Sequence, residues 1–167
     1  DLVGAGETYS LNGFRGALLV QYALWAVGLT GLLVTRRAVR AQLAAEGVHH
    51  LLLGHTLDGR DLDLLQIGEP AKHLRTCWIV ARQHPGETMA EWLVEGLLAR
   101  LLDPEDPVAR SLRQRAVFNI VPNMNPDGSF RGNLRVNAAG ANLNREWQSP
   151  TRERSPEVLL VRQRMEQ

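Results

Sequence analysis

The chain has 167 residues, of which 44% are apolar and 22% are charged, and these proportions are typical of a globular protein with a substantial core. Its formal net charge of +1 provides no electrostatic basis for binding nucleic acid, so we expect no nucleic-acid partner. Cys77 is the single cysteine, which excludes an internal disulfide, and we expect it to be a small buried apolar residue.

Residues 1–40 are more apolar than the rest, and their pattern predicts a helical segment. Residues 17–34 carry no charge, and an arginine-rich stretch at residues 36–40 follows them. A run of this length lies at the lower limit for a membrane span, whose flanking arginines would place the following residues in the cytoplasm. We favour the alternative, a helix buried against protein, because the run is short and contains glycine. Residues 41–167 then form the globular part of the chain.

A β-hairpin is predicted at the start of the globular part. Val48–Leu53 and Asp61–Ile67 are strand-like runs, and Asp58-Gly59 between them is a strong signal for a tight turn. Four histidines lie in or near this hairpin, and none has a carboxylate at a short ligand spacing. We assign none of them to a site: His49, His50, His55 and His73.

A strand, two helices and a second strand are predicted after the hairpin. Thr76–Ala81 is an apolar, β-branched run that predicts a buried strand, and the apolar residues of Thr88–Leu102 recur at helical spacing. Val108–Arg115 predicts a short helix, and Arg115–Val121 predicts a second buried strand. This order predicts a βαβ unit, whose functional loops gather at the carboxyl ends of its parallel strands. A last helix is expected at Ser155–Gln167.

The most informative stretch is His84-Pro85-Gly86-Glu87, which lies between the first of these strands and its helix. Pro85 and Gly86 suit a sharp turn that aims the histidine and the glutamate at one point. An imidazole nitrogen and a carboxylate oxygen are a common part of a catalytic zinc site, which has three protein ligands and an open position for water. The alternative is a simple Pro-Gly turn, with Glu87 favoured by the dipole of the following helix.

A long segment rich in asparagine, glycine and proline, residues 122–147, follows the second buried strand. Such a composition predicts turns and a loop rather than a regular element. A connection of this length favours a functional loop over an inert one.

The order of these motifs resembles the zinc metallocarboxypeptidases, in particular the cytosolic carboxypeptidase-like branch and its bacterial members. The resemblance covers residues 48–167. Five stretches carry it: Gly54–Arg60, Arg82–Thr88, Asn123–Gly128, Gly132–Arg135 and Asn142–Trp147. The fold that it implies is α/β: part of the metallocarboxypeptidase-type α/β/α sandwich with a mixed sheet, preceded here by the apolar helical segment.

The resemblance also implies roles for individual residues. His84 and Glu87 match two zinc ligands, and Arg135 matches the arginine that polarises the scissile carbonyl and stabilises its oxyanion. Asn144 and Arg145 match the pair that binds the terminal carboxylate of the substrate. The chemistry agrees, because a guanidinium fits a planar carboxylate and because fixed donors contribute most to rate where charge develops in the transition state. The implied cofactor is Zn²⁺, and the implied partner is the C-terminus of a peptide or protein.

Two parts of the family's active site have no counterpart in the sequence. The third zinc ligand of the family is a histidine on a later strand, and its general base is a glutamate further on, whereas no histidine follows Glu87 here. We therefore expect an incomplete catalytic domain, and we expect the polypeptide by itself to be inactive because a ligand and the base are missing. Residues 125–128 match a loop that shapes the wall of the site, and we expect no catalytic role for them.

The leading functional hypothesis is a zinc-dependent metallocarboxypeptidase, which removes C-terminal residues from peptides or proteins. A zinc deacylase of N-acyl amino acids is an alternative with the same fold, since both substrates carry the carboxylate that Asn144 and Arg145 would bind. A third hypothesis is a catalytically inactive binding or membrane-associated protein. The expected location is the cytoplasm, and the alternative is a membrane-anchored protein whose catalytic part is cytoplasmic.

Overall fold

The computed structural model describes residues 48–167, which belong to one compact unit. The predicted helical segment 1–40, including the apolar run 17–34, lies outside the described residues. None of the helices in the described part is long and apolar enough to cross a membrane.

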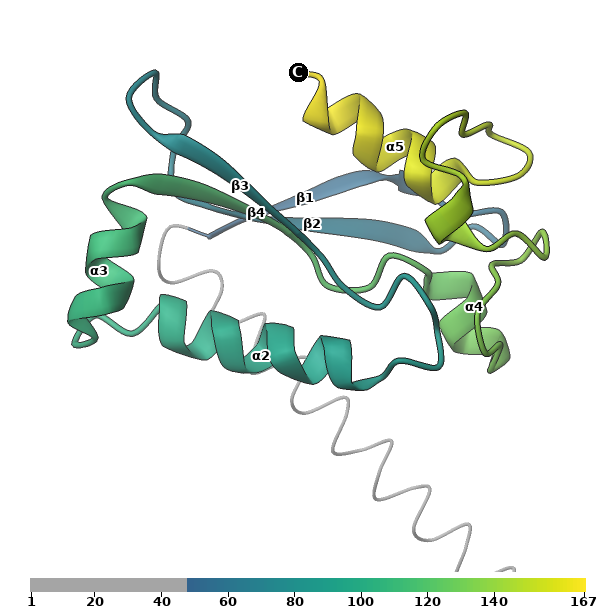
Figure 1. Ribbon diagram of the computed structural model, residues 1–167, viewed down its shortest axis with the longest axis horizontal. Helices are drawn as coiled ribbons and strands as arrows, with labels where there is room; N and C mark the ends of the chain where they lie inside the picture. Colours follow the sequence, from purple (N-terminus) through teal and green to yellow (C-terminus); the bar gives the residue numbers. More distant parts are fainter. Residues whose placement is uncertain (1–47) are drawn as a thin grey trace, which may run out of the picture. The chain divides into compact units, whose positions relative to one another are not determined.

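Four strands form a mixed sheet in the order β1-β2-β4-β3 (Figure 1). β1 (Val48–His55) and β2 (Asp61–Ile67) pair antiparallel, which confirms the predicted hairpin. β4 (Ala116–Val121) pairs antiparallel with β2 and parallel with β3 (Arg75–Val80). The parallel pair confirms the predicted βαβ unit and sets the end of the sheet at which its loops gather.

Two helices connect the parallel strands, as the apolar periodicity predicts. α2 spans Met89–Leu101, and α3 spans Pro107–Arg113. α3 begins after Asp106, whose carboxylate accepts hydrogen bonds from the backbone nitrogens of Val108 and Ala109 at 2.7 and 3.1 Å. These bonds satisfy donors that the first turn of a helix otherwise leaves free.

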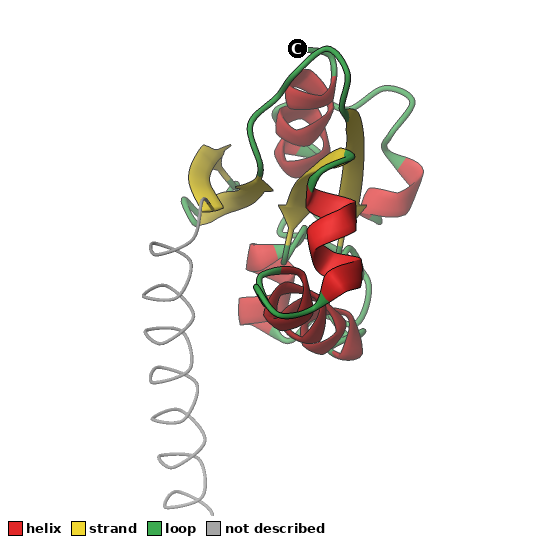
Figure 2. Cartoon of the chain, turned by 90° about the vertical axis from the view of Figure 1, so that its left-hand side faces the viewer, coloured by secondary structure: helices red, strands yellow, loops and turns green. Residues whose placement is uncertain are grey.

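Helices cover both faces of the sheet, with α5 (Pro156–Met165) on one side and α2 on the other (Figure 1, Figure 2). Alternate residues of each strand therefore face different helical layers. The core on the α5 side consists of fully buried apolar residues: Leu62, Leu64, Val121, Met124, Leu143, Val158 and Val161. Buried residues on the opposite face of the sheet and in α2 form the other layer: Leu65, Ile67, Ile120, Val94 and Leu98. The arrangement confirms the expected α/β fold, and α5 confirms the last predicted helix.

β3 differs from the predicted buried strand, because it is the outermost strand of the sheet in the part of the chain that the structure describes. Trp78, Ile79 and Val80 are half-buried. Within residues 48–167 only β4 pairs with β3, along one of its edges, so no strand on the other edge supplies side chains to pack beside those of β3. The expectation that Cys77 is buried is wrong for the same reason, since its side chain is also half-buried.

The segment after β4 contains regular structure where the composition predicts a loop. α4 spans Pro126–Arg131, and a short 3₁₀ helix, η1, spans Leu143–Arg145. Asn125 caps α4, because its side-chain oxygen accepts a hydrogen bond from the Gly128 backbone nitrogen at 3.0 Å. Pro126 suits the first position of a helix. The prediction of a loop is therefore wrong for these residues, whose turn-forming types act here as helix caps.

Candidate active site

A sharp change of direction after β3 places the His84 loop at the carboxyl end of the parallel strands. Arg82 adopts a left-handed backbone conformation, with φ of 47°, which is uncommon for a residue with a side chain. Its Nε atom donates to the Pro85 carbonyl at 2.9 Å, and its Nη1 atom donates to the Glu91 carboxylate at 2.5 Å. Because Glu91 lies in the first turn of α2, the Arg82 side chain fastens the loop to that helix.

His84 and Glu87 lie at the two ends of one turn. The Glu87 backbone nitrogen donates to the His84 carbonyl at 3.0 Å, and His84 Nδ1 lies 3.1 Å from Glu87 Oε1. The His84 side chain is 10% exposed, whereas that of Glu87 is 52% exposed, so the pair is open to an approaching ligand on the side of the carboxylate. The structure thus brings these two predicted residues together.

The separation of these two atoms fits the coordination of one zinc ion. Nitrogen and oxygen ligands bind zinc tetrahedrally at about 2.0–2.2 Å, so two of them lie about 3.3 Å apart. The observed 3.1 Å is close to this value. Residues 48–167 contain no group of three or more His, Cys, Asp or Glu side chains that could hold a metal. His84 and Glu87 are thus of the right types and at a suitable separation to be ligands, and a catalytic zinc site needs three protein ligands.

Three histidines of the hairpin lie on its exposed surface, away from this pair. Each has a ring nitrogen 2.6 to 3.1 Å from a carboxylate oxygen: His49 from Glu69, His50 from Asp63 and His55 from Asp61. One carboxylate and one imidazole at the surface contribute little to stability. Their geometry gives no reason to assign them to the site.

The second ring nitrogen of His84 faces two residues from the segment after β4. His84 Nε2 lies 3.1 Å from Asn142 Oδ1 and 3.2 Å from Arg135 Nη2. The structure therefore places Arg135, a residue predicted for the site, beside His84. Asn142 begins the Asn142–Trp147 stretch that carries the resemblance, but the sequence assigns it no role of its own.

Asn144 and Arg145 lie on η1 immediately after Asn142, and both are exposed. The Asn142 Oδ1 atom that faces His84 also accepts a hydrogen bond from the Asn144 backbone nitrogen at 3.1 Å. This bond joins η1 to the His84 cluster. The Arg145 guanidinium makes no hydrogen bond to His84. Within residues 48–167 neither side chain is engaged in a hydrogen bond or ion pair, so their donors are available to a ligand.

α4 packs between the two loops that carry His84 and Arg135. At Gly128 the approach is so close that an added Cβ atom would lie 2.5 Å from both the Pro85 Cγ atom and the Val136 carbonyl oxygen. A glycine is therefore needed at this position for α4 to contact both loops at once. Any shift of α4 would change the relative positions of the two predicted site residues.

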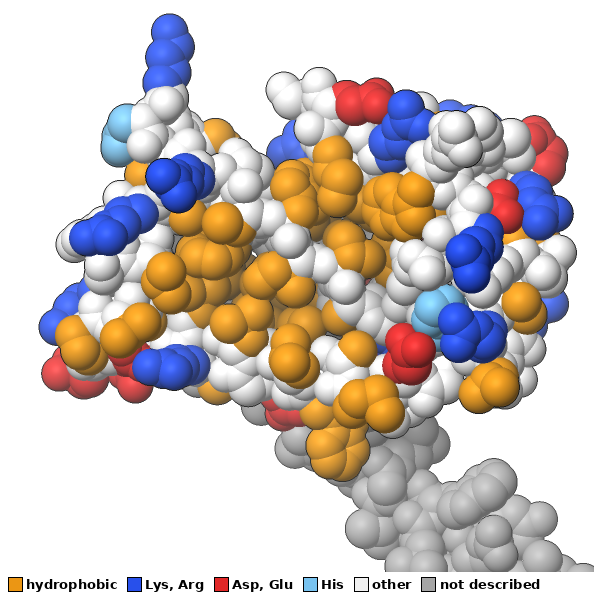
Figure 3. All heavy atoms as spheres, viewed as in Figure 1, with side chains coloured by type: hydrophobic (Ala, Val, Ile, Leu, Met, Phe, Trp, Pro, Cys, Tyr) orange, Lys and Arg blue, Asp and Glu red, His pale blue; other side chains and the backbone are white. Residues whose placement is uncertain are grey.

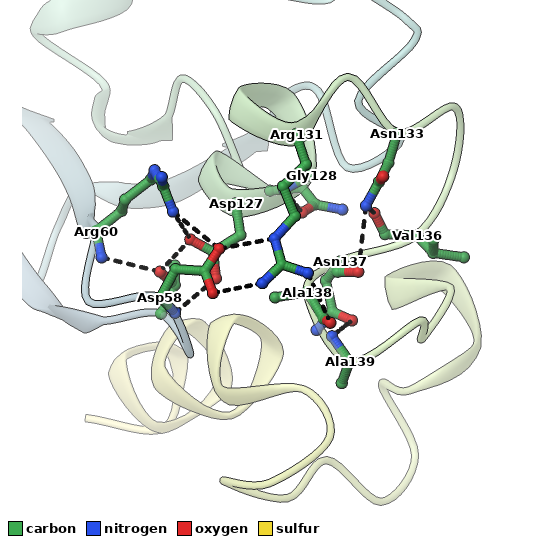
Figure 4. A network of polar contacts seen from close by, with 12 residues as sticks. Asp58, Arg60, Asp127, Gly128, Arg131, Asn133, Val136, Asn137, Ala138 and Ala139 are labelled. Carbon is green, nitrogen blue, oxygen red and sulfur yellow. Dashed lines mark hydrogen bonds and ion pairs between the residues drawn. The ribbon is translucent and has the colours of Figure 1, made fainter.

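A polar network fastens α4 to the turn between β1 and β2 (Figure 4). The buried Asp127 carboxylate accepts hydrogen bonds from the Thr56 hydroxyl at 2.6 Å and from the Asp58 backbone nitrogen at 3.0 Å. Arg60 Nη1 donates a third, at 2.9 Å. The Asp58 carboxylate accepts from Arg131 Nε and Nη2 at 2.8 and 2.6 Å, and these bonds hold the pKa of its carboxyl below the usual value. The network fixes α4, and through it the two loops.

A second buried contact fixes the segment between Arg135 and Asn142. Asn137 is 1% exposed, and its Nδ2 atom donates to the Glu157 carboxylate at 3.1 Å and to the Arg154 carbonyl at 2.9 Å. Glu157 is fully buried in α5, and this burial raises the pKa of its carboxyl above the usual value. α5 therefore supports the segment that carries Arg135 and Asn142.

Exposed apolar side chains adjoin the His84 loop. Figure 3 shows a histidine grouped with acidic and basic side chains, and apolar side chains gathered over much of the same face. The most exposed large apolar residues of the described part belong to α2 and the segment around α4: Met89 66%, Trp92 75%, Leu93 66%, Phe130 76% and Leu134 75%. Leu134 borders the site directly, because its carbonyl accepts a hydrogen bond from the Gly86 nitrogen at 3.0 Å. Clustered exposed apolar side chains mark interaction surfaces.

A His-x-x-Glu turn at the carboxyl end of a parallel strand, beside an exposed arginine, is typical of zinc hydrolases with an α/β fold. Comparison with known proteins identifies the family within this class, because the model of the zinc carboxypeptidase family matches residues 40–159. The chain therefore belongs to the zinc carboxypeptidase family, as the resemblance of its motifs indicates.

Individual relatives agree with this assignment. An uncharacterized protein of Zymomonas mobilis is 62% identical over 72% of this chain and 31% of its own length. Cytosolic carboxypeptidase 1 of mouse is 47% identical over 48% of this chain and 7% of its own length. The structure of a metallo-carboxypeptidase from Pseudomonas aeruginosa, in complex with (2-guanidinoethylmercapto)succinic acid, is 48% identical, with a TM-score of 0.73 over 79% of this chain and 35% of that chain. The chain thus spans about a third of these two bacterial relatives.

Proposed function

We propose that the chain forms part of the active site of a zinc-dependent metallocarboxypeptidase, which hydrolyses the bond before the C-terminal residue of a peptide or protein. The observation that carries the proposal is the 3.1 Å separation of His84 Nδ1 and Glu87 Oε1, with Arg135 Nη2 3.2 Å from the other ring nitrogen. A metal and a guanidinium side by side are the groups that polarise a scissile carbonyl. Membership of the zinc carboxypeptidase family supports the same activity.

His84 and Glu87 are the proposed zinc ligands from this chain. Bound zinc lowers the pKa of its water to near 7, which supplies a nucleophile at neutral pH. Arg135 is proposed to donate to the carbonyl oxygen of the substrate as negative charge develops on it. Its side chain is exposed, and within residues 48–167 it has no carboxylate partner that would hold it away from a substrate. A third ligand and a general base are needed besides these residues, so we expect no appreciable hydrolysis by the polypeptide alone.

Asn144 and Arg145 are proposed to bind the terminal carboxylate of the substrate. A guanidinium forms two parallel hydrogen bonds to a carboxylate, and the Asn144 side chain can donate one more. The exposure of both residues on η1, next to Asn142 and His84, supports this role. The Pseudomonas aeruginosa relative binds a derivative of succinic acid, a carboxylate ligand, which also supports it. We propose a cytoplasmic location because several relatives are cytosolic carboxypeptidases.

Calorimetric titration of the 167-residue chain with Zn²⁺ tests the metal site. We expect one zinc ion per chain, and we expect His84→Ala and Glu87→Ala each to lower its affinity at least about tenfold, since even outer-shell partners of a metal contribute that much. His73→Ala is the matched control, because His73 is exposed and unassigned, and it should leave the affinity unchanged. Equal affinities for all four proteins would contradict the proposal.

Nuclear magnetic resonance titration with a short acetylated peptide tests the carboxylate site. The free acid should shift the backbone resonances of Asn144 and Arg145, whereas the same peptide with an amidated C-terminus should not. Arg145→Ala should abolish the response, because the planar fork that recognises the carboxylate is removed. Equal responses to the acid and the amide would exclude recognition of the terminal carboxylate.

A further inference from the structure

One ring nitrogen of His84 faces two partners that it cannot serve at the same time. His84 Nε2 lies 3.1 Å from Asn142 Oδ1, an acceptor, and 3.2 Å from Arg135 Nη2, a donor. A neutral imidazole nitrogen either carries a hydrogen and donates, or carries a free lone pair and accepts. Each neighbour therefore selects one of the two tautomers of His84.

Asn142 selects the tautomer with its hydrogen on Nε2. The orientation of its amide is fixed by the backbone, because Oδ1 also accepts a hydrogen bond from the Asn144 nitrogen at 3.1 Å. With Nε2–H donating to Asn142, the lone pair lies on Nδ1, which faces Glu87 Oε1 at 3.1 Å. A metal at His84 and Glu87 requires this tautomer, because it binds the unprotonated nitrogen.

Arg135 selects the opposite tautomer. A guanidinium has donors and no acceptor, so its bond to Nε2 uses the lone pair there and leaves the ring hydrogen on Nδ1. That hydrogen then points at Glu87 Oε1, and the two groups that would hold a metal are bonded to each other. The bonds of this state are charge-assisted, with guanidinium on one side of the ring and carboxylate on the other, so we expect it to predominate without metal.

We infer that Arg135 and a divalent metal compete for His84 through this choice of tautomer. With a metal held at Nδ1, the ring hydrogen would lie on Nε2. Nε2 would then donate to Asn142, and Arg135 would lose its acceptor on the ring. The two states differ only in which ring nitrogen carries the hydrogen, and the hydrogen exchanges through solvent. The inference rests on the proposed function for its metal, zinc. Its consequence is that the guanidinium becomes free for a substrate carbonyl when the metal is in place.

The ring ¹⁵N resonances of His84 report its tautomer directly, and comparison with His84→Gln assigns them. We expect mainly the Nδ1–H tautomer in the metal-free chain and mainly the Nε2–H tautomer in Arg135→Ala. Arg145→Ala removes the same charge from the same segment without touching His84, and it should leave the tautomer unchanged. Asn142→Ala should leave the Nδ1–H tautomer predominant.

Zinc titration of the same variants gives a second readout. Arg135→Ala should bind Zn²⁺ about 3- to 10-fold more tightly, because the competing hydrogen bond is gone. Asn142→Ala should bind about tenfold more weakly, and Arg145→Ala should differ by less than about twofold at physiological salt. Circular dichroism establishes whether each variant is folded. If Asn142→Ala does not fold, the comparison of Arg135→Ala with the parent chain is sufficient for the test.

Failure of the proposed metal site and failure of the proposed competition give different results. If His84→Ala and Glu87→Ala bind Zn²⁺ as tightly as the parent chain, the proposed metal site is wrong. If those variants lose zinc but Arg135→Ala leaves both the tautomer and the affinity unchanged, the site stands and the competition is refuted.

Discussion

Two polar clusters meet at α4, and they differ in how well their donors and acceptors match. In the cluster around Asp127 the carboxylate is fully buried and accepts hydrogen bonds from three donors. In the cluster around His84 one ring nitrogen faces a donor and an acceptor together, and the Glu87 side chain is 52% exposed. A fully satisfied buried network fixes one structure, whereas an open cluster with unmatched groups retains binding capacity for a ligand. The first cluster should therefore govern stability, and the second should govern metal binding.

Asp127→Ala should break the first cluster and have the largest effect on stability. It leaves the Thr56 hydroxyl and the Arg60 guanidinium without their buried acceptor, so we expect a loss of about 3 kcal/mol in the free energy of unfolding. Urea denaturation measures this loss. Asp61→Ala is the control, because Asp61 is 62% exposed and its one ion-pair partner in the described part of the chain is His55. Its effect should stay within about 0.5 kcal/mol. Similar losses for both variants would mean that the network does not hold α4.

Gly128→Ala tests whether α4 transmits its position to the site. The new methyl group would overlap Pro85 and the Val136 carbonyl, so we expect destabilisation of about 1–3 kcal/mol together with weaker zinc binding. Gly96→Ala is the matched control, because no atom of the described residues lies within 4 Å of its added Cβ on α2. It should stabilise the chain by about 0.5–1 kcal/mol and leave zinc affinity unchanged. Equal zinc affinities in the two folded variants would show that the clusters are independent.

Glu157→Gln should have the smallest effect, and its sign depends on pH. Burial raises the pKa of Glu157, so the folded chain holds this proton more tightly than the unfolded chain does. The associated stability is complete below the unfolded pKa, near 4.5, and is lost as pH rises through the folded pKa. The glutamine variant lacks this loss, so its stability relative to the parent should rise towards neutral pH.

Urea denaturation between pH 4 and pH 7 measures the pH dependence of this difference. Glu153→Gln is the matched control, since Glu153 is exposed on the segment before α5. It should follow the parent curve throughout. A constant difference between parent and Glu157→Gln at all pH values would contradict a raised pKa at Glu157.

The sequence predicts the elements whose patterns are local. The hairpin, the parallel strands, α2 and α5 follow from apolar periodicity and turn residues. The sequence does not predict α4, because Asn125-Pro126-Asp127-Gly128 contains residue types that both form turns and cap helices. Only tertiary packing decides between a turn and a helix here. The sequence does not predict the exposure of β3 either, because an apolar run does not report whether a neighbouring strand is present.

The candidate site likewise has parts that the sequence predicts and parts that it does not. The pairing of His84 with Glu87 follows from three residues of separation and a Pro-Gly turn. Arg135 is identified through the resemblance to a family, since nothing in its neighbours links it to His84. Asn142 contacts His84 across 58 residues of sequence, and asparagine is too common in loops for its type to signal a role. Long-range contacts of this kind are decided by packing, which a single sequence does not record.

Anomalous X-ray diffraction from crystals of the chain soaked in Zn²⁺ tests the metal site and the tautomer together. We expect one zinc ion about 2.0–2.2 Å from both His84 Nδ1 and a Glu87 carboxylate oxygen, with Asn142 still at Nε2 and the Arg135 guanidinium turned away. Zinc bound to His84 Nε2, or bound only to the histidines of the hairpin, would contradict it.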